Sequence, residues 1–289
     1  MGIAGTFDID RFMEGSGKVD LSDIDWSDVP KHPVTPEALR TLRYFMNTEN
    51  ATFFYVKTLM QTKAPFVEPE LAPFLSAWVY EEEFHGRAFR KFLEAYGDPV
   101  DRDYRANLYR TRGVGERVDE LGQRVLSALF ADAWPAVHMT WGVVQEWTTY
   151  MAYQSLIERV SHPILHRICH RIMKQELRHF AFYREQARRR LRSPAVQKVV
   201  TAALKIGWTP VGDGMSSKLE TIHAVQFLFD GMDGEEVSTI DRKMRELPGL
   251  EWFDLFTRYV TRHQIPKAPA SWLQQGAPPS EPPIAAIGA

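Results

Sequence analysis

Two pairs of residues in this sequence have the spacing Glu-x-x-His, namely Glu82 with His85 and Glu176 with His179. Residues three positions apart share one face of an α-helix, so both side chains of a pair can reach the same metal ion. One such pair is weak evidence, because a short motif arises by chance in a chain with nine histidines. A third pair, Glu220 with His223, is interpreted as coincidental, because no further carboxylate-bearing helices remain to complete a site around it.

Two isolated glutamates, Glu49 and Glu146, lie in the middle of two other segments with helical periodicity. All four glutamates have apolar residues three, four or seven positions away, which is typical of a helix face that points into the core. These apolar residues are Phe45, Met46, Phe53 and Val56 around Glu49; Trp78, Val79 and Phe89 around Glu82; Met139, Val143 and Tyr150 around Glu146; and Ile172, Met173, Phe180 and Tyr183 around Glu176. Gly142, four residues before Glu146, lets a neighbouring group approach the backbone closely.

Four buried carboxylates without cations among these neighbours would be costly, since an unpaired buried carboxylate costs several kcal/mol or takes up a proton. Two divalent ions would balance them, with two neutral imidazoles completing the coordination. The set of one Glu from each of two helices and one Glu-x-x-His from each of two others is that of ferritin-like di-iron and di-manganese carboxylate proteins. The pattern predicts six metal ligands: Glu49, Glu82, His85, Glu146, Glu176 and His179.

The elements that must position these ligands are helical, and the predicted fold is all-α. We expect a ferritin-like four-helix bundle that carries a di-iron site, with additional C-terminal helices. Long helices are predicted over about 36–63, 69–96, 118–160 (interrupted by Pro135) and 163–191, and shorter ones from 194 and over 216–229, 236–246 and 250–263. Residues 1–34 are expected to form an irregular arm, 35–263 a single helical domain (bundle about 36–192, accessory helices about 194–263) and 264–289 a flexible tail.

The composition excludes several other classes of protein. The 289 residues carry 35 Lys and Arg against 37 Asp and Glu, so no basic field indicates nucleic acid. The single cysteine, Cys169, excludes an intrachain disulfide framework and a cysteine-rich zinc site. No apolar run is long enough for a membrane span, and the N-terminus lacks the pattern of a signal peptide. A cytoplasmic location is therefore expected.

The ligand motifs resemble those of the soluble acyl-carrier-protein desaturases, a branch of the ferritin-like di-iron superfamily. That family carries Trp-x-x-Glu-Glu-x-x-His-Gly, which is matched by Trp78, Glu81, Glu82, His85 and Gly86. Thr48-Glu49-Asn50-Ala51, Glu146 with Thr149, and Glu176 with Arg178 and His179 match its three other motifs. The resemblance covers roughly residues 36–192 and is specific as a combined pattern.

The resemblance implies roles for these residues. Glu82 and Glu176 would bridge two iron ions, Glu49 and His85 would complete one iron, and Glu146 and His179 would complete the other. Thr149 would lie beside the oxygen-binding face and assist oxygen activation or proton delivery; a helical Thr that bonds back to a carbonyl is the alternative. Such an enzyme takes electrons from ferredoxin, uses O₂ as co-substrate, and removes two hydrogens from an acyl chain on acyl carrier protein. A homodimer is also expected.

The sequence departs from the family pattern at three positions. Gln175 and Phe180 stand where the second Glu-x-x-His motif has acidic neighbours, and Phe84 replaces the Arg before the first His. A di-iron oxygenase or hydroxylase with another apolar or carrier-bound substrate therefore stays open as the alternative, with manganese possible in one position. A ferritin-like iron-storage or peroxide-scavenging protein is disfavoured by the aromatic stripes and the accessory helices. The arylamine N-oxygenases have an additional His where this chain has Ile172.

A cluster of cations lies at the end of the fourth predicted helix: Arg184, Arg188, Arg189, Arg190, Arg192 and Lys198. Acyl carrier protein is acidic, so this cluster could dock it. The alternative is that the cations simply stabilise a helix C-terminus, where positive charge is favourable.

Overall fold

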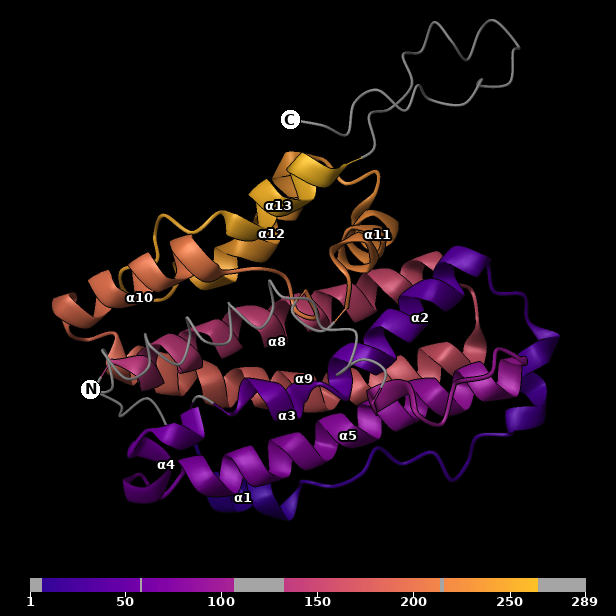
Figure 1. The fold of residues 1–289 in the computed structure, drawn as a ribbon, viewed down its shortest axis with the longest axis horizontal. Helices are drawn as coiled ribbons and strands as arrows, with labels where there is room; N and C mark the ends of the chain where they lie inside the picture. Colours follow the sequence, from indigo (N-terminus) through magenta and orange to yellow (C-terminus); the bar gives the residue numbers. More distant parts are fainter. Residues whose placement is uncertain (1–6, 58, 107–132, 214–215, 265–289) are drawn as a thin grey trace, which may run out of the picture.

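The computed structural model describes residues 7–57, 59–106, 133–213 and 216–264, and within these ranges it is helical and contains no strand. Four helices form the bundle: α2 (Pro36–Glu49), α5 (Leu71–Tyr96), α8 (Trp134–Arg159) and α9 (Pro163–Arg190). Helix α2 packs along α5, and α8 packs along α9 (Figure 1). The predicted all-α, ferritin-like bundle with further C-terminal helices is confirmed.

Local signals set most of the predicted helix ends. The Thr35 side chain caps the start of α2, the His162 side chain caps the start of α9, and each cap is followed by a proline in the first turn. Helix α5 ends at Gly97, whose φ of 90° is the left-handed conformation that glycine adopts without strain. Residues 118–132 of the third predicted helix lie outside the described ranges, and the rest forms α8.

The predicted helix over 36–63 is wrong beyond Glu49, where α2 ends. The Asn50 side chain donates a hydrogen bond back to the Met46 carbonyl at 2.8 Å and another to the Tyr104 hydroxyl at 2.7 Å. The chain then continues through the short helices α3 (Thr52–Tyr55), η2 (Leu59–Gln61) and α4 (Ala64–Val67). Phe53, which a continuous helix would have placed in the core, is therefore 68% exposed.

The N-terminal arm contains two short elements, α1 (Ile9–Glu14) and η1 (Trp26–Lys31), and both pack against α5. In Figure 1, α1 lies on the outer side of α5, away from α8. Phe12 of α1 is buried against Phe74 of α5, with ring centroids 5.2 Å apart. The arm is thus part of the packed structure beside the bundle centre.

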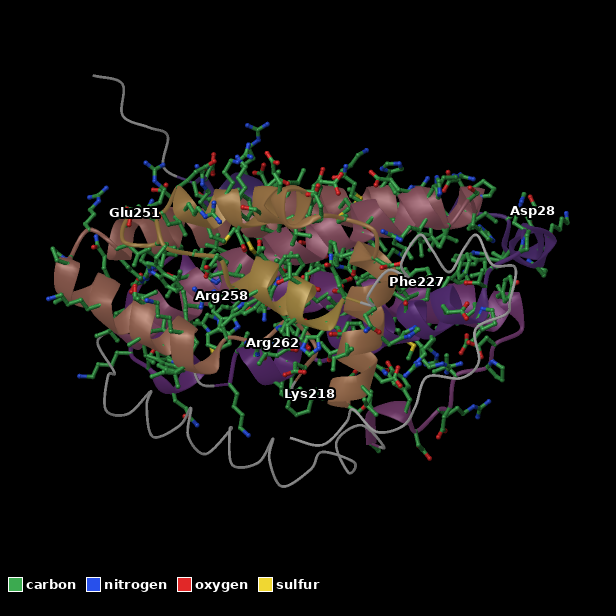
Figure 2. All side chains as sticks on the ribbon, turned by 90° about the horizontal axis from the view of Figure 1, so that it is seen from above. Asp28, Lys218, Phe227, Glu251, Arg258 and Arg262 are labelled. Carbon is green, nitrogen blue, oxygen red and sulfur yellow. The ribbon has the colours of Figure 1, made fainter. Side chains whose placement is uncertain are left out.

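The accessory helices are α10 (Pro194–Gly207), α11 (Lys218–Phe229), α12 (Gly234–Arg245) and α13 (Leu255–His263). They lie on the α8 side of the bundle, where α10 and α12 contact α8 and α11 contacts α2 (Figure 1). Seen from above, α11 and α13 lie over the bundle, with Arg258 and Arg262 marking α13 (Figure 2). The predicted tail lies outside the described residues from 265 onward.

The buried apolar residues form two clusters, and the predicted stripes contribute to both of them. These stripes are buried apart from Phe53 and the half-buried Val79 and Tyr150. A Cβ on Gly142 would lie 2.3 Å from the Tyr183 ring, which confirms the predicted close approach at this glycine. In the described segments, no helix is both long and apolar enough to cross a membrane.

Candidate metal centre

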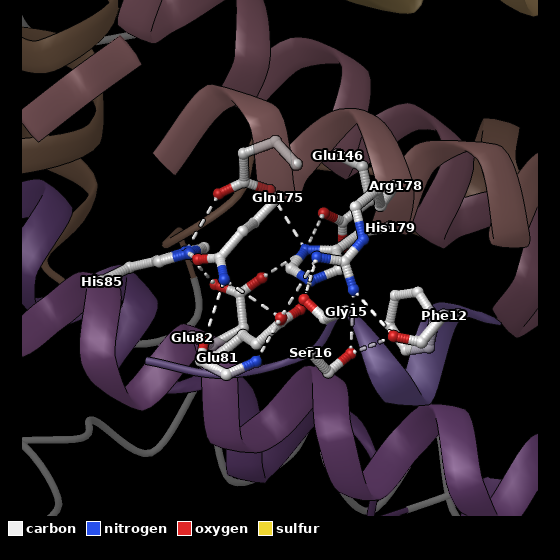
Figure 3. Close-up of polar contacts among 12 residues, drawn as sticks. Phe12, Gly15, Ser16, Glu81, Glu82, His85, Glu146, Gln175, Arg178 and His179 are labelled. Carbon is white, nitrogen blue, oxygen red and sulfur yellow. Dashed lines mark hydrogen bonds and ion pairs between the residues drawn. The ribbon is translucent and has the colours of Figure 1, made fainter. Parts of the chain in front are cut away.

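The six predicted ligands come together in the middle of the bundle, one or two from each of its four helices (Figure 3). All six side chains are buried, with exposures of 5% or less. Their ligand atoms form two overlapping groups, and within each group the atoms lie within 4.8 Å of one another. The groups are Glu49, Glu82, His85 and Glu176, and Glu82, Glu146, Glu176 and His179.

Glu82 and Glu176 belong to both groups, and each of them presents a different oxygen to each histidine. Glu82 Oε2 lies 3.5 Å from His85 Nδ1, whereas Glu82 Oε1 lies 3.1 Å from His179 Nδ1. Glu176 Oε1 lies 3.2 Å from His85 Nδ1, and Glu176 Oε2 lies 3.5 Å from His179 Nδ1. This arrangement suits two carboxylates that bridge two ions.

Each of the other two glutamates belongs to one group. Glu49 Oε2 lies 3.5 Å from His85 Nδ1, and Glu146 Oε2 lies 3.4 Å from His179 Nδ1. The pairing of Glu49 with His85 and of Glu146 with His179 is the one that the desaturase motifs imply.

Two hydrogen bonds hold the outer nitrogens of the histidines. His179 Nε2 donates to Glu81 Oε2 at 2.7 Å, and His85 Nε2 donates to Gln175 Oε1 at 2.8 Å. Because both Nε2 atoms are engaged in these hydrogen bonds, Nδ1 is the ring atom of each histidine that faces the centre of the site, where it could bind a cation after releasing its own proton. Although burial acts against ionisation of Glu81, its hydrogen bond from His179 holds its pKa below the usual value, so Glu81 is a carboxylate.

Glu81 and Gln175 are joined to each other and to the N-terminal arm. Gln175 Nε2 donates to Glu81 Oε1 at 3.0 Å and to the Gly17 carbonyl at 2.8 Å, and the Gly17 N–H donates to Glu81 Oε1 at 3.0 Å. Arg178 holds the same part of the arm through the carbonyls of Phe12 and Gly15 (Figure 3). Gln175 therefore keeps a polar link between the two histidines even though it replaces an acidic residue of the desaturase pattern.

Buried polar atoms of the site that lack hydrogen-bond partners within the described ranges indicate that it can hold divalent cations. His85 Nδ1, His179 Nδ1 and Glu176 Oε1 are buried and have no hydrogen-bond partner among the described residues. Such atoms are rare in folded proteins unless a ligand or ion completes them. Oxygen and imidazole nitrogen are also the donors that iron and manganese accept.

Burial and charge shift the ionisation of these ligands. Burial, with repulsion from neighbouring carboxylates, raises the pKa of Glu49 and Glu146 well above the usual value. Burial acts to lower the pKa of His85 and His179, but the surrounding carboxylates outweigh it and raise both well above the usual value. Protons therefore compete with cations for this site.

Two tyrosines beside the ligands were not assigned a role from the sequence. The Tyr153 hydroxyl donates a hydrogen bond to Glu49 Oε1, and burial followed by the charge of Glu49 raises the pKa of this tyrosine. Tyr183 lies near Glu146, and burial raises its pKa well above the usual value. Both tyrosines lie seven residues after a predicted ligand. Tyr183 belongs to the apolar stripe around Glu176, whereas the stripe given for Glu146 did not include Tyr153.

The structure also locates Thr149 and the Glu220–His223 pair, both singled out in the sequence. Thr149 is buried on α8 one turn after Glu146, and its neighbour Thr148 bonds back to the Val144 carbonyl. Glu220 is ion-paired with Arg40 at 2.8 Å, and the two candidate metal groups of the described segments do not include the Glu220–His223 pair.

Half of the cation cluster at the end of α9 is neutralised by ion pairs. Arg184 pairs with Glu246 at 2.7 Å, Arg189 pairs with Glu70 at 2.9 Å, and Arg190 pairs with Glu68. Arg188, Arg192 and Lys198 are exposed.

Comparison with known proteins supports the assignment of the fold. No known family profile matches the sequence, and no curated protein matches it. The structure is similar to that of an R2-like ligand-binding oxidase with an aerobically reconstituted Mn/Fe cofactor, with a TM-score of 0.55, 17% identity and coverage of 89% of each chain. The chain has a ferritin-like fold. At this identity the likeness concerns the fold, and the ligand assignment depends on the geometry of this chain.

Proposed function

We propose that the protein is a di-iron, O₂-dependent oxidoreductase that introduces a double bond into an acyl chain bound to a carrier protein. The observation that carries the proposal is the pair of shared carboxylates, because Glu82 and Glu176 each offer one oxygen to each half of the site. Two redox-active ions held this way would supply electrons to bound O₂. The similar oxidase carries a Mn/Fe cofactor, so manganese in one position is the alternative to iron in both.

The residues of this chain have three tasks in such a reaction. The six ligands hold the ions, while Glu81 and Gln175 fix the orientation of both imidazoles. The aromatic side chains around them exclude water, as shown by the rings of Phe74 and Phe182, which stack 3.7 Å apart. Thr149 is proposed to assist proton delivery, because it is buried one turn from Glu146.

The proposed reaction balances with an external reductant. One saturated –CH₂–CH₂– unit, one O₂, two electrons and two protons give one –CH=CH– unit and two waters. Ferredoxin is the proposed electron donor, and an acyl chain on acyl carrier protein is the proposed substrate; both follow from the resemblance to the desaturases.

The test is mass spectrometry of a panel of acyl carrier proteins after incubation with iron-loaded protein, O₂, ferredoxin, its reductase and NADPH. Loss of two hydrogens from one chain length would establish a desaturase and identify its substrate. Gain of one oxygen atom would instead establish the alternative, an oxygenase on the same scaffold. No change on any carrier, with iron bound at two per chain, would reject the carrier-bound acyl substrate.

A further inference from the structure

Four buried polar groups beside the metal centre have no hydrogen-bond partner in the described part of the chain. They are Trp78 Nε1, Trp134 Nε1, His138 Nε2 and the Tyr183 hydroxyl. The side chains of Trp78, Trp134 and Tyr183 are more than nine-tenths buried. Buried polar groups are nearly always partnered, so several unpartnered groups in one region indicate a partner that the described residues do not supply.

These groups lie in one region, on the three helices that meet at the second half of the metal site. The Tyr183 ring lies 5.4 Å from the Trp78 ring and 6.2 Å from the His138 ring, measured between centroids. The Trp78 ring in turn lies 6.5 Å from the ring of the metal ligand His179.

A path along α8 connects this region to the metal site. Residues 134, 138, 142 and 146 follow one another at intervals of four, so each of them lies beside the next on the helix surface, along a path that winds around α8. The absence of a side chain at Gly142 lets the Tyr183 ring lie against the backbone between His138 and Glu146. Eight residues separate His138 from Glu146, which corresponds to about 12 Å along the helix at ~1.5 Å per residue.

The chemistry of the region favours a ligand that accepts hydrogen bonds. An indole N–H can only donate, and a tyrosine hydroxyl can donate. Burial, assisted by the positive charge of Arg190, lowers the pKa of His138 to about 4, so this imidazole is neutral near pH 7. The aromatic rings of Phe74 and Phe182 stack against each other beside Tyr183, so these surroundings favour an apolar chain for the rest of the ligand.

We propose that Trp78, His138 and Tyr183, with Trp134 beyond them, bind the carbonyl or carboxylate group of an amphiphilic substrate, whose apolar chain then extends toward the metal centre. This proposal deepens the proposed function and rests on it for the identity of the reacting site. It assigns these residues a positioning role: the fixed separation between the bound head group and Glu146 would determine which carbon of the chain faces the metal ligands.

The location also suits a substrate that enters from the end of α9. Arg190 and Arg189 of that end are held against Glu68 and Glu70, beside the start of α5. The exposed Arg188 and Arg192 lie on the same terminus. A thioester carbonyl on a carrier docked there and the carboxylate of a free acid present the same accepting group, and experiment can separate these two sources.

The test measures binding to the full, iron-loaded protein without O₂ or reductant. The probes are dodecanoate, methyl dodecanoate and dodecane, each in competition with a fluorescent apolar probe. Trp78→Phe replaces the indole by a smaller aromatic ring without an N–H, and Tyr183→Phe removes the hydroxyl and keeps the ring. Trp252→Phe is the matched control, because the Trp252 indole donates to the Gly249 carbonyl at 3.0 Å, far along the chain from this region.

We expect Trp78→Phe and Tyr183→Phe to weaken binding of the acid, the ester or both by about tenfold, the loss of one hydrogen bond. Dodecane binding and the control should not change. Tighter binding of the acid would indicate a free carboxylate substrate, whereas tighter binding of the ester would indicate a carrier-bound thioester. Equal binding of all three probes, or binding unaffected by both variants, would overturn the proposal.

A second measurement separates this role from a structural one. A donor with no partner in the protein adds no stabilising hydrogen bond, so Tyr183→Phe should keep the Tm and the iron content of the unsubstituted protein. A clear fall in the Tm of Tyr183→Phe would show that this donor is paired within the protein and would also overturn the proposal. Trp78→Phe should lower the Tm for a different reason, because the smaller ring leaves a cavity in the core. Binding is measured without turnover. A negative result would therefore reject the proposed binding site for the head group and would leave the proposed oxidation to be decided by mass spectrometry.

Discussion

Glu82 differs from Glu49 in that it belongs to both groups of ligands, whereas Glu49 belongs to one. Removing a shared carboxylate takes one oxygen from each ion, and removing Glu49 takes a ligand from one ion alone. We therefore expect Glu82→Ala to abolish turnover and to lower the bound iron of both positions, and Glu49→Ala to leave one position filled. Iron per chain, measured by mass spectrometry on desalted protein, checks this.

The control for these variants is Glu83→Ala. Glu83 lies next to Glu82 on α5, but its carboxylate pairs with Arg87 at 2.8 Å and with Arg105 at the surface. Its removal should leave the iron content unchanged. Full iron occupancy together with full activity in Glu82→Ala would refute the ligand assignment.

Glu81 is the carboxylate that accepts a hydrogen bond from His179 Nε2, the ring nitrogen that points away from the centre of the site. Glu81→Gln keeps the size of the side chain but removes the negative charge that raises the basicity of the imidazole. Loss of such a partner typically costs about 10- to 100-fold in metal affinity or activity. Competition for Fe²⁺ against a chelator should show a loss of this size, whereas Glu94→Gln, which alters a surface partner of Arg90 on the same helix, should bind iron normally. Equal affinities for the two variants would contradict the assigned role.

At the scale of the elements, the contact between α8 and α9 depends on Gly142. A methyl group there would meet the Tyr183 ring at 2.3 Å, and the ring is held on its other sides by Phe74 and Trp78. Overpacking of this kind costs about 1–3 kcal/mol, which outweighs the gain of up to ~1 kcal/mol from replacing a helical glycine. Gly142→Ala should therefore lower the free energy of unfolding in urea.

Gly207→Ala is the comparison for that measurement. A methyl group at the end of α10 would meet its nearest neighbour, Trp141, at an ordinary distance of 3.5 Å. Gly207→Ala should leave the free energy of unfolding unchanged or slightly raised. A Gly142→Ala protein as stable as Gly207→Ala would show that the Tyr183 ring can move away from α8.

The elements also show how far the sequence predicts this structure. The starts of α2 and α9 and the end of α5 depend on caps, prolines and glycine within a few residues, so local pattern located them closely. The end of α2 at Glu49 depends on Tyr104, which accepts from Asn50 across 54 residues, and no local pattern contains that contact.

In the candidate site too, residues that follow a local sequence pattern could be predicted, and roles that depend on contacts distant in the sequence could not. Helical spacing identified all six residues that the structure brings together at the candidate site, because i,i+3 pairs and apolar stripes are local features. The roles of Glu81 and Gln175 could not be found in this way, because Gly17 of the N-terminal arm binds both of them across 64 and 158 residues. Glu81 is buried like its neighbour Glu82, although adjacent residues point to different faces of a helix. The signal for Glu81 in the sequence is its place in the motif that resembles the desaturases, and that resemblance assigned it no role.

At the scale of the whole molecule, the exposed cations at the end of α9 are the proposed contact for an acidic carrier. Arg188 and Arg192 are exposed, whereas Arg189 and Arg190 hold Glu70 and Glu68. Arg188→Glu with Arg192→Glu should therefore raise KM for a carrier-bound substrate severalfold at low salt and leave the fold intact. The same double change should not affect kcat, and an unchanged KM would reject this docking surface.

The stability of the whole chain should depend on pH more strongly without metal than with it. In the metal-free protein, Glu49, Glu146, His85 and His179 have raised pKa values, so the folded state keeps protons that the unfolded state has released above pH 6.5, the ordinary pKa of histidine. Stability falls with pH wherever the folded state binds more protons. The lowered pKa values of Glu82 and Glu176 contribute stability that is lost only as the pH falls below about 4.5, outside this window.

Metal ions displace those same protons, so their binding strengthens as the pH rises. The Tm of the metal-free protein should therefore fall as the pH rises above 6.5, while the Tm of the anaerobic Fe²⁺ form should fall less or rise, because binding to the folded state adds stability. The difference between the two Tm values should widen steadily with pH. A constant difference would mean that no protons leave when iron binds, which is incompatible with four raised pKa values among the ligands.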